Sequence, residues 1–217
     1  MADVVSVDHP VAHHFEDAGQ QREAASLGMW IFLVTEVMFF GGLFTIYTVY
    51  RALYPTAFQA ASHHLDVQLG TFNTGVLIGS SLTMALAVWA SHTGRRRTTI
   101  GFLIATMALG SVFLGVKAVE YAHKFHEHHV PGPSFEWEGP LAGPAQLFYS
   151  LYFAMTGLHA LHMVIGLGIL GWLVWQTARG RFGPAYNTPV EISGLYWHFV
   201  DIVWIFLFPL LYLIGRH

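Results

Sequence analysis

Five segments of 20 or more mostly apolar residues make up most of this 217-residue sequence. A helix needs roughly 20 apolar residues to cross a membrane, so each segment is long enough to span one. The segments extend over approximately residues 27–53, 69–90, 99–121, 145–176 and 192–214. We therefore predict an all-α integral membrane protein, a bundle of five transmembrane helices over residues 27–217. Residues 1–26 are predicted to form a cytoplasmic, acidic tail that contains histidines.

The composition excludes several other classes of protein. Charged residues make up 11% of the chain, against about 25% in soluble globular domains, and hydrophobic residues make up 54%. A soluble domain could not cover its surface with so few charges. The net charge of −3 lacks the basic excess of a nucleic-acid-binding protein, so we expect no nucleic acid as partner. The absence of cysteine rules out disulfides and cysteine-ligated metal.

The lysines and arginines predict how the bundle is oriented. Six arginines fall in the tail and in the connections that share its side, and three of them form the run 95–97. Only three basic residues fall on the opposite side. Because basic residues favour the cytoplasmic side, we expect the N-terminus inside and the C-terminus outside. The histidines near the N-terminus could collect protons there, although a disordered acidic tail is the simpler interpretation.

Glu36 lies well inside the first apolar segment, close to the expected midplane of the membrane. Ionisable residues at that depth are costly, and those that occur are mostly functional. One interpretation is a carboxyl group that is hydrogen-bonded to another helix. The other is a proton-accepting site or an acid that faces lipid, and we favour a role in function or assembly.

Histidines in the fourth and fifth segments raise the possibility of a cofactor site. His159 and His162 are three residues apart and share one helix face, and His198 in the fifth segment could add a third ligand. However, a pair of histidines falls short of a complete metal or haem site. We therefore favour hydrogen bonds between helices, and we expect no haem or metal on this chain.

The fifth segment also carries a polar stripe. One third of its circumference contains Glu191, Gly194, His198, Asp201 and Tyr212. His198 and Asp201 are one turn apart, a spacing at which they could pair. Such a stripe faces protein rather than lipid, as a proton path or, in the simpler case, as packing between helices.

The third segment ends in a run of charged residues and histidines. Lys117, Glu120 and Lys124 have ion-pair spacing along a helix. Four histidines follow around Glu127, which suggests a metal site, but a solvated helix end is the simpler interpretation. The four histidines are His123, His126, His128 and His129.

Four segments of the chain, in the right order, resemble subunit III of the haem-copper cytochrome c and quinol oxidases. The most specific is Y-W-H-F-V-D-I-V-W-I-F-L-F at 196–208, followed by F-A-M-T-G-L-H-A-L-H at 153–162. T-E-V-M-F-F at 35–40 and E-Y at 120–121 are similar to the corresponding family segments. The residues that match in kind are Glu36, Glu120, Tyr121, His159, His162, His198 and Asp201.

The resemblance implies a specific function. It implies the bacterial five-helix form, which lacks the first two helices of the seven-helix form. Subunit III of this family binds no haem or copper and packs on the large haem-bearing subunit I of a complex that also contains subunit II. It also holds phospholipid, supports proton uptake and protects the active site during turnover. Glu36 matches the family's carbodiimide-reactive carboxyl. The implied location is the bacterial inner membrane.

Two kinds of alternative stay open at this point. Within the family, the chain could belong to a quinol oxidase or accompany a nitric oxide reductase. In a different class, it could be a stand-alone membrane carrier or haem-binding protein that uses Glu36, His159, His162 and His198. The subunit interpretation is favoured because the sequence shows neither an internal repeat nor a pair of broken helices.

Overall fold

A computed structural model describes residues 15–137, 140–184 and 186–213 of the chain. Its five long helices are α1 (Ala18–Leu53), α3 (Val67–His92), α4 (Arg96–His126), α5 (Ala142–Ala178) and α6 (Thr188–Phe208). A short helix α2 (Pro55–His63) follows α1, and α6 continues into one π-helical turn, η1 (Pro209–Leu213). All five long helices are apolar enough to cross a membrane. The predicted all-α bundle of five spans is confirmed.

Several helices differ in extent from the apolar segments in the sequence. The first begins at Ala18 rather than at Leu27, because the Asp17 carboxylate caps it and accepts a hydrogen bond from the backbone of Gln20 at 2.7 Å. Part of the expected tail is therefore helical. Helix α2 was not expected, and it starts with Pro55, which suits a first helical turn. Residues 1–14 and their histidines lie outside the described residues.

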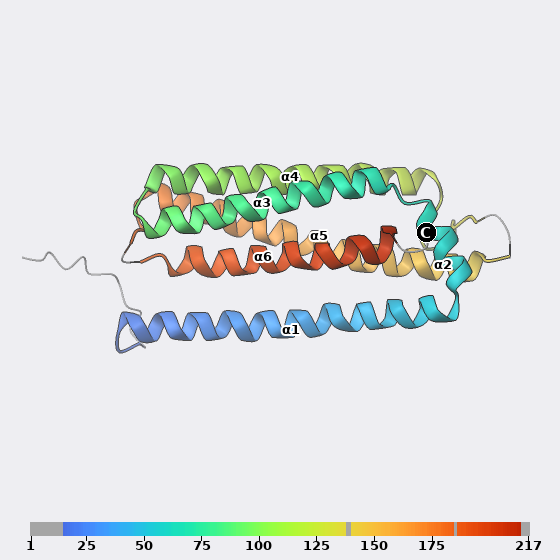
Figure 1. The fold of residues 1–217 in the computed structure, drawn as a ribbon, viewed down its shortest axis with the longest axis horizontal. Helices are drawn as coiled ribbons and strands as arrows, with labels where there is room; N and C mark the ends of the chain where they lie inside the picture. The colour runs from blue at the N-terminus through green and yellow to red at the C-terminus, as the bar shows by residue number, and fades with distance from the viewer. Residues whose placement is uncertain (1–14, 138–139, 185, 214–217) are drawn as a thin grey trace, which may run out of the picture.

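The helices run up and down, so the bundle has two distinct ends. The proximal end carries the start of α1 and the α3–α4 and α5–α6 connections, and the distal end carries α2 and the α4–α5 connection (Figure 1). Helices α3 and α4 form a close pair, and α1 lies along the outside beside α6 (Figure 1). Helix α6 packs against α1, α3 and α5, so it is the central helix of the bundle.

Helix α1 is attached to the bundle by a narrow stripe. Only Leu33, Phe40 and Tyr47, spaced by seven residues, are buried along it. In the most apolar 18-residue window of α1, 11% of residues are buried, against 61% in α6. Most of α1 is therefore free to contact lipid or another protein.

Close approach of the central helices depends on two glycines. The buried indole of Trp197 on α6 lies between Gly110 on α4 and Gly166 on α5, and a Cβ atom at either glycine would come within 2.9 Å of the indole. The indole Nε1 also donates a hydrogen bond of 2.8 Å to Ser80 on α3. One side chain thus joins four helices, as small residues at helix interfaces allow.

Candidate functional site

Three separate groups of polar side chains within the bundle contain most of the candidate residues. The first is the Glu36–His162 pair between α1 and α5. The second is the tyrosine–lysine cluster, which consists of Lys117, Glu120, Tyr152 and Tyr212. The third lies between α3 and α6 and contains Ser81, His198 and Asp201. Each group has a different chemistry.

The Glu36–His162 pair lies near the middle of both helices that form it. A carboxylate oxygen of Glu36 lies 3.2 Å from Nε2 of His162, and the two side chains are 19% and 11% exposed. Nδ1 of His162 lies 2.9 Å from the backbone carbonyl of Leu158, so Nδ1 carries a hydrogen and donates it. Nε2 is therefore the atom that exchanges a proton with Glu36. Phe40 covers the imidazole, with ring centres 5.5 Å apart.

This geometry gives the pair a defined chemistry. A proton placed between Glu36 and His162 can reside on the carboxyl group or on the imidazole, and both arrangements keep the hydrogen bond. The backbone of His162 is fixed in turn, since its carbonyl accepts a hydrogen bond of 2.9 Å from the Tyr196 hydroxyl. Of the sequence-predicted residues, Glu36 and His162 are thus brought together by two helices that meet at mid-membrane depth.

Glu36 is expected to be the chain's carbodiimide-reactive acid. A hydrophobic carbodiimide takes a proton from a carboxyl group in apolar surroundings, and Glu36 is the partly exposed acid in the middle of α1. Labelling by a radioactive or fluorescent carbodiimide should fall to background in Glu36→Gln, whose amide keeps the shape of the side chain.

The matched control for this labelling is Glu23→Gln. Glu23 is an exposed acid near the start of the same helix, outside the apolar segment, so its replacement should leave the label in place. A label that survives in Glu36→Gln and disappears in Glu23→Gln would contradict the assignment.

His159 lies in different surroundings from His162. It is 1% exposed and packs against the rings of Phe113 and Trp204, each with its ring centre 5.3 Å from that of the imidazole. These two rings also contact each other, with centres 4.8 Å apart. Neither ring nitrogen has a hydrogen-bond partner among the described residues. No group of three or more histidines and acids that could hold a metal occurs in the part of the chain that the structure describes. Aromatic rings, rather than further ligating side chains, are thus the described neighbours of the His159 imidazole.

The tyrosine–lysine cluster satisfies two buried charges. The Lys117 ammonium donates to Glu120 at 3.0 Å, to Tyr152 at 3.0 Å and to Tyr212 at 2.9 Å, which uses all three of its hydrogens. Tyr152 donates to the other oxygen of Glu120 at 2.8 Å, and Tyr212 donates to the same oxygen. The expected Lys117–Glu120 pair is therefore present, whereas Lys124 bonds Glu127 and the carbonyl of His64 instead of Glu120. The hydroxyl of the adjacent Tyr121 bonds Thr156 on α5, while its ring lies against Lys117 and Tyr152 of the cluster.

The polar stripe of α6 faces α3 over most of its length. Glu191 accepts a hydrogen bond from Nε2 of His92 at 2.7 Å, and it also binds Arg22 of α1 at 3.2 Å. His198 forms a hydrogen bond of 2.7 Å through Nδ1 with the Ser81 hydroxyl. His198 and Asp201, whose spacing allows a pair, do not form a hydrogen bond with each other, and the imidazole bonds Ser81 instead. Tyr212 departs from the stripe and belongs to the tyrosine–lysine cluster.

Ionisable residues also gather at the distal end, outside the spans. Glu127 accepts hydrogen bonds from Lys124 at 2.6 Å and from His129 at 3.1 Å. Partial burial alone would raise the pKa of Glu127, but the bonds and charges of Lys124 and His129 hold that pKa below its usual value. Burial lowers the pKa of His129, although Glu127 opposes this effect. The imidazole of His129 stacks on Tyr149 with ring centres 5.0 Å apart.

Protonation of His129 should make the fold less stable in mild acid. Because the pKa of His129 is lower in the folded state than the unfolded value of about 6.5, the unfolded chain binds more protons below that pH. The stability contributed by the neutral imidazole is therefore complete above about pH 6.5 and decreases as the pH falls toward the folded-state pKa. We expect the unfolding temperature of the detergent-solubilised protein to decrease from pH 7.5 to pH 5.5.

The variant His129→Phe keeps an aromatic ring against Tyr149 and removes the titratable imidazole. His129→Phe should weaken the pH dependence of the unfolding temperature, while His126→Phe at an exposed position of α4 should not. An identical pH dependence in wild type and His129→Phe would refute this assignment. Glu127, whose pKa is lowered, would reduce stability only at more acidic pH.

Comparison with known proteins assigns this arrangement to a family. The sequence model of cytochrome c oxidase subunit III matches residues 11–216. Cytochrome c oxidase subunit 3 of Corynebacterium diphtheriae is 34% identical over 91% of this chain and 95% of its own length. The corresponding subunit of Thermostichus vulcanus is 30% identical over 98% and 94% of the two chains. Quinol oxidase subunit 3 of Bacillus spizizenii is 35% identical over 87% and 86%.

The matched region includes every membrane-spanning helix and all three polar groups. With five spans and bacterial relatives, the chain is a multi-pass protein of the bacterial inner membrane. The resemblance noted from four sequence segments is confirmed over nearly the whole length. The chain therefore belongs to the cytochrome c oxidase subunit III family of the haem-copper oxidases.

Proposed function

We propose that this chain is a non-catalytic subunit III of a respiratory haem-copper oxidase, with cytochrome c oxidase as the first candidate. The observation that carries the proposal is the family match over residues 11–216, which includes all five spans. In this proposal haem and copper reside in subunit I and subunit II, on which this chain packs. The surroundings of His159 support that division, since the described neighbours of its imidazole are the rings of Phe113 and Trp204.

The proposed contribution to oxygen reduction is indirect. The Glu36–His162 pair places a carboxyl group and an imidazole 3.2 Å apart near the middle of both helices, a geometry in which a proton can be shared, and this suits a role in proton uptake by the partner subunit. Helix α1 leaves much apolar surface uncovered, including Trp30, Met38 and Phe39. That surface suits structural phospholipid between this chain and its partners. Subunit III would then keep the catalytic subunit supplied with protons and protected during turnover.

The proposed orientation places the proximal end inside the cell. This end carries Arg22, the run 95–97, Arg179 and Arg181, in agreement with the preference of basic residues for the cytoplasmic side. A reporter that is active only in the cytoplasm should be active at the N-terminus and inactive at His217. The reverse pattern would contradict the proposed orientation.

Co-purification tests the proposed function directly. An affinity tag on this chain, expressed from its own chromosomal locus, should retain a large haem-bearing subunit with a haem absorption spectrum and oxygen-reducing activity. Recovery of the chain without any haem-bearing partner would contradict the proposal. The same preparation with this chain deleted should still reduce oxygen but lose activity faster during turnover.

A quinol oxidase is the second candidate, since the Bacillus spizizenii relative carries that name at 35% identity. The electron donor resides in the partner subunits, so the purified complex distinguishes the two. Oxidation of reduced cytochrome c favours the first candidate, and oxidation of a quinol without cytochrome c favours the second.

A further inference from the structure

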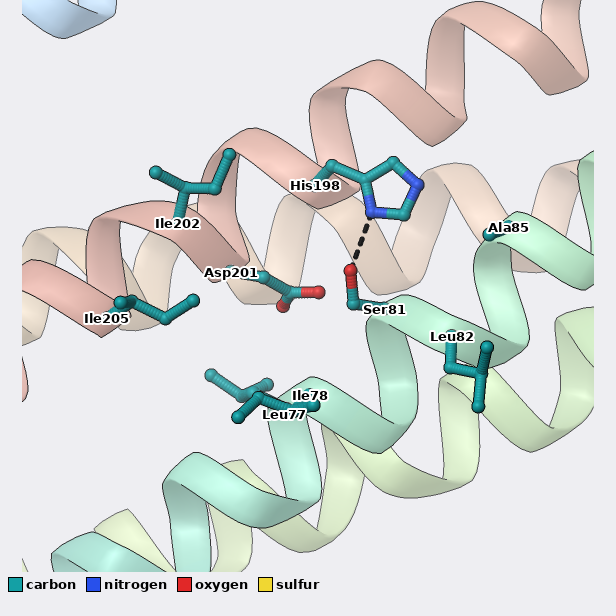
Figure 2. A pocket seen from close by; sticks show the side chains of 9 residues that line it. All are labelled: Leu77, Ile78, Ser81, Leu82, Ala85, His198, Asp201, Ile202 and Ile205. Atoms are coloured by element: carbon teal, nitrogen blue, oxygen red, sulfur yellow. Dashed lines mark hydrogen bonds between the residues drawn. The ribbon is translucent and has the colours of Figure 1, made fainter.

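A groove runs between α3 and α6 on the lipid-facing side of the bundle. Its floor contains Ser81 and Asp201, and large aliphatic side chains form its rims (Figure 2). The free volume is about 370 Å³, far more than one water molecule needs. The residues that line it are Leu77, Ile78, Ser81, Leu82, Ala85, His198, Asp201, Ile202 and Ile205.

The carboxyl group of Asp201 is directed into this groove (Figure 2). Asp201 is 3% exposed, and neither of its oxygens has a hydrogen-bond partner among the described residues. The Ser81 hydroxyl, the polar group in front of it, shares a hydrogen bond with Nδ1 of His198 in which either partner can be the donor, so Ser81 has at most one hydrogen to turn toward Asp201. Even then, one of the two carboxyl oxygens has no partner among the described residues.

The depth of Asp201 restricts what can supply the missing donor. Asp201 lies midway along the 26-residue span from Thr188 to Leu213, about 19 Å from either end at 1.5 Å per residue. Lipid headgroups lie at the ends of the span, and acyl chains carry no donors. Leaving a polar group without a partner is energetically costly in hydrocarbon surroundings, where no water can replace it. Another transmembrane helix can place a hydrogen-bond donor at the membrane midplane, because its backbone is satisfied internally and its side chains can be polar.

We propose that the α3–α6 groove is the docking site for a transmembrane helix of another oxidase subunit, which inserts a hydrogen-bond-donating side chain toward Asp201. The proposal rests on the proposed function, since it requires a multi-subunit complex. The shape of the groove suits such a helix. Ser81 and Ala85 are one turn apart and small, so a second backbone can approach closely there. Leu82 and Ile202 flank this floor and are 61% and 50% exposed, so they can pack against the incoming helix.

Photo-crosslinking in the purified complex tests the contact. The photoreactive amino acid benzoylphenylalanine is placed at position 82 or 202 on the rims, and at position 104 on α4 as control, because Ile104 is similarly exposed at 51% and lies away from the groove. Irradiation should crosslink positions 82 and 202, but not position 104, to a transmembrane segment of one other subunit. Mass spectrometry identifies the crosslinked segment. Adducts only with lipid, adducts with a second copy of this chain, or equal yields at all three positions would overturn the proposal.

Substitution of Asp201 tests the hydrogen bond itself. Asp201→Leu removes the acceptor and should lower the fraction of this chain retained in the complex by roughly three- to tenfold, the range for one interhelical hydrogen bond in a membrane. Asp201→Asn keeps one acceptor oxygen and should restore most of the retention. Carbodiimide labelling of Glu36 reports whether the Asp201→Leu chain is still folded. Equal retention of the wild-type chain and the folded Asp201→Leu chain would overturn the proposal.

The two proposals fail in distinguishable ways. A chain that never co-purifies with a haem-bearing subunit contradicts the proposed function and, with it, the docking site. A chain that co-purifies but forms only lipid adducts at positions 82 and 202 contradicts the docking site alone.

Discussion

Replacement of Lys117 by methionine is expected to destabilise the bundle by about 3–5 kcal/mol, the cost of leaving one partner of a buried ion pair unpaired. Lys117 and Glu120 are both at most 4% exposed, so water cannot solvate the carboxylate that remains. The hydroxyl groups of Tyr152 and Tyr212 still donate to it, but they carry no neutralising charge. Unfolding of the purified chain by denaturant in mixed micelles measures the loss.

The decisive comparison is with the double variant. Lys117→Met combined with Glu120→Gln removes both charges, and the glutamine oxygen still accepts from the two tyrosines. We therefore expect the double variant to be close to wild type in its free energy of unfolding, because buried ion pairs are often neutral relative to uncharged replacements. Glu120→Gln alone should be as destabilising as Lys117→Met alone. A double variant that loses the sum of the two single losses would contradict this interpretation.

The five spans could be predicted from the sequence because hydrophobic length alone determines them. Roughly 20 apolar residues must cross a membrane as a helix, since no water is present to satisfy an exposed backbone. The ends of the helices were less predictable. Asp17 starts α1 within a polar segment, and Pro55 starts the short helix α2, both through local capping that hydrophobicity does not report.

The candidate residues could be found in the sequence because polar side chains stand out in apolar segments. Their hydrogen-bond partners could not be predicted, because those partners lie on other helices. The one-turn spacing of His198 and Asp201 allows a pair, yet the register of α3 brings Ser81 to His198 first. Tyr152 joins Lys117 and Glu120 only because α5 packs on α4 at that height. Register between helices depends on how side chains pack, and periodicity within one helix does not fix it.

The largest packing effect is expected at Trp197, the central side chain of the bundle. Trp197→Ala should lower the free energy of unfolding by about 3–5 kcal/mol, as for other buried large aromatic residues. The reason is that Gly110 and Gly166 have no side chains to refill the space, and Ser80 loses the donor that now bonds it. Trp197→Phe should cost less, since a ring remains between the two glycines.

Trp172→Ala is the matched control for this loss. Trp172 is a tryptophan of α5 that is 46% exposed, so lipid or detergent replaces most of what the substitution removes. Denaturant unfolding in the same mixed micelles should therefore place Trp172→Ala near wild type and Trp197→Ala far below it, with Trp197→Phe between them. Equal losses for the two alanine variants would show that the glycine-lined site of Trp197 is not what holds the four helices together.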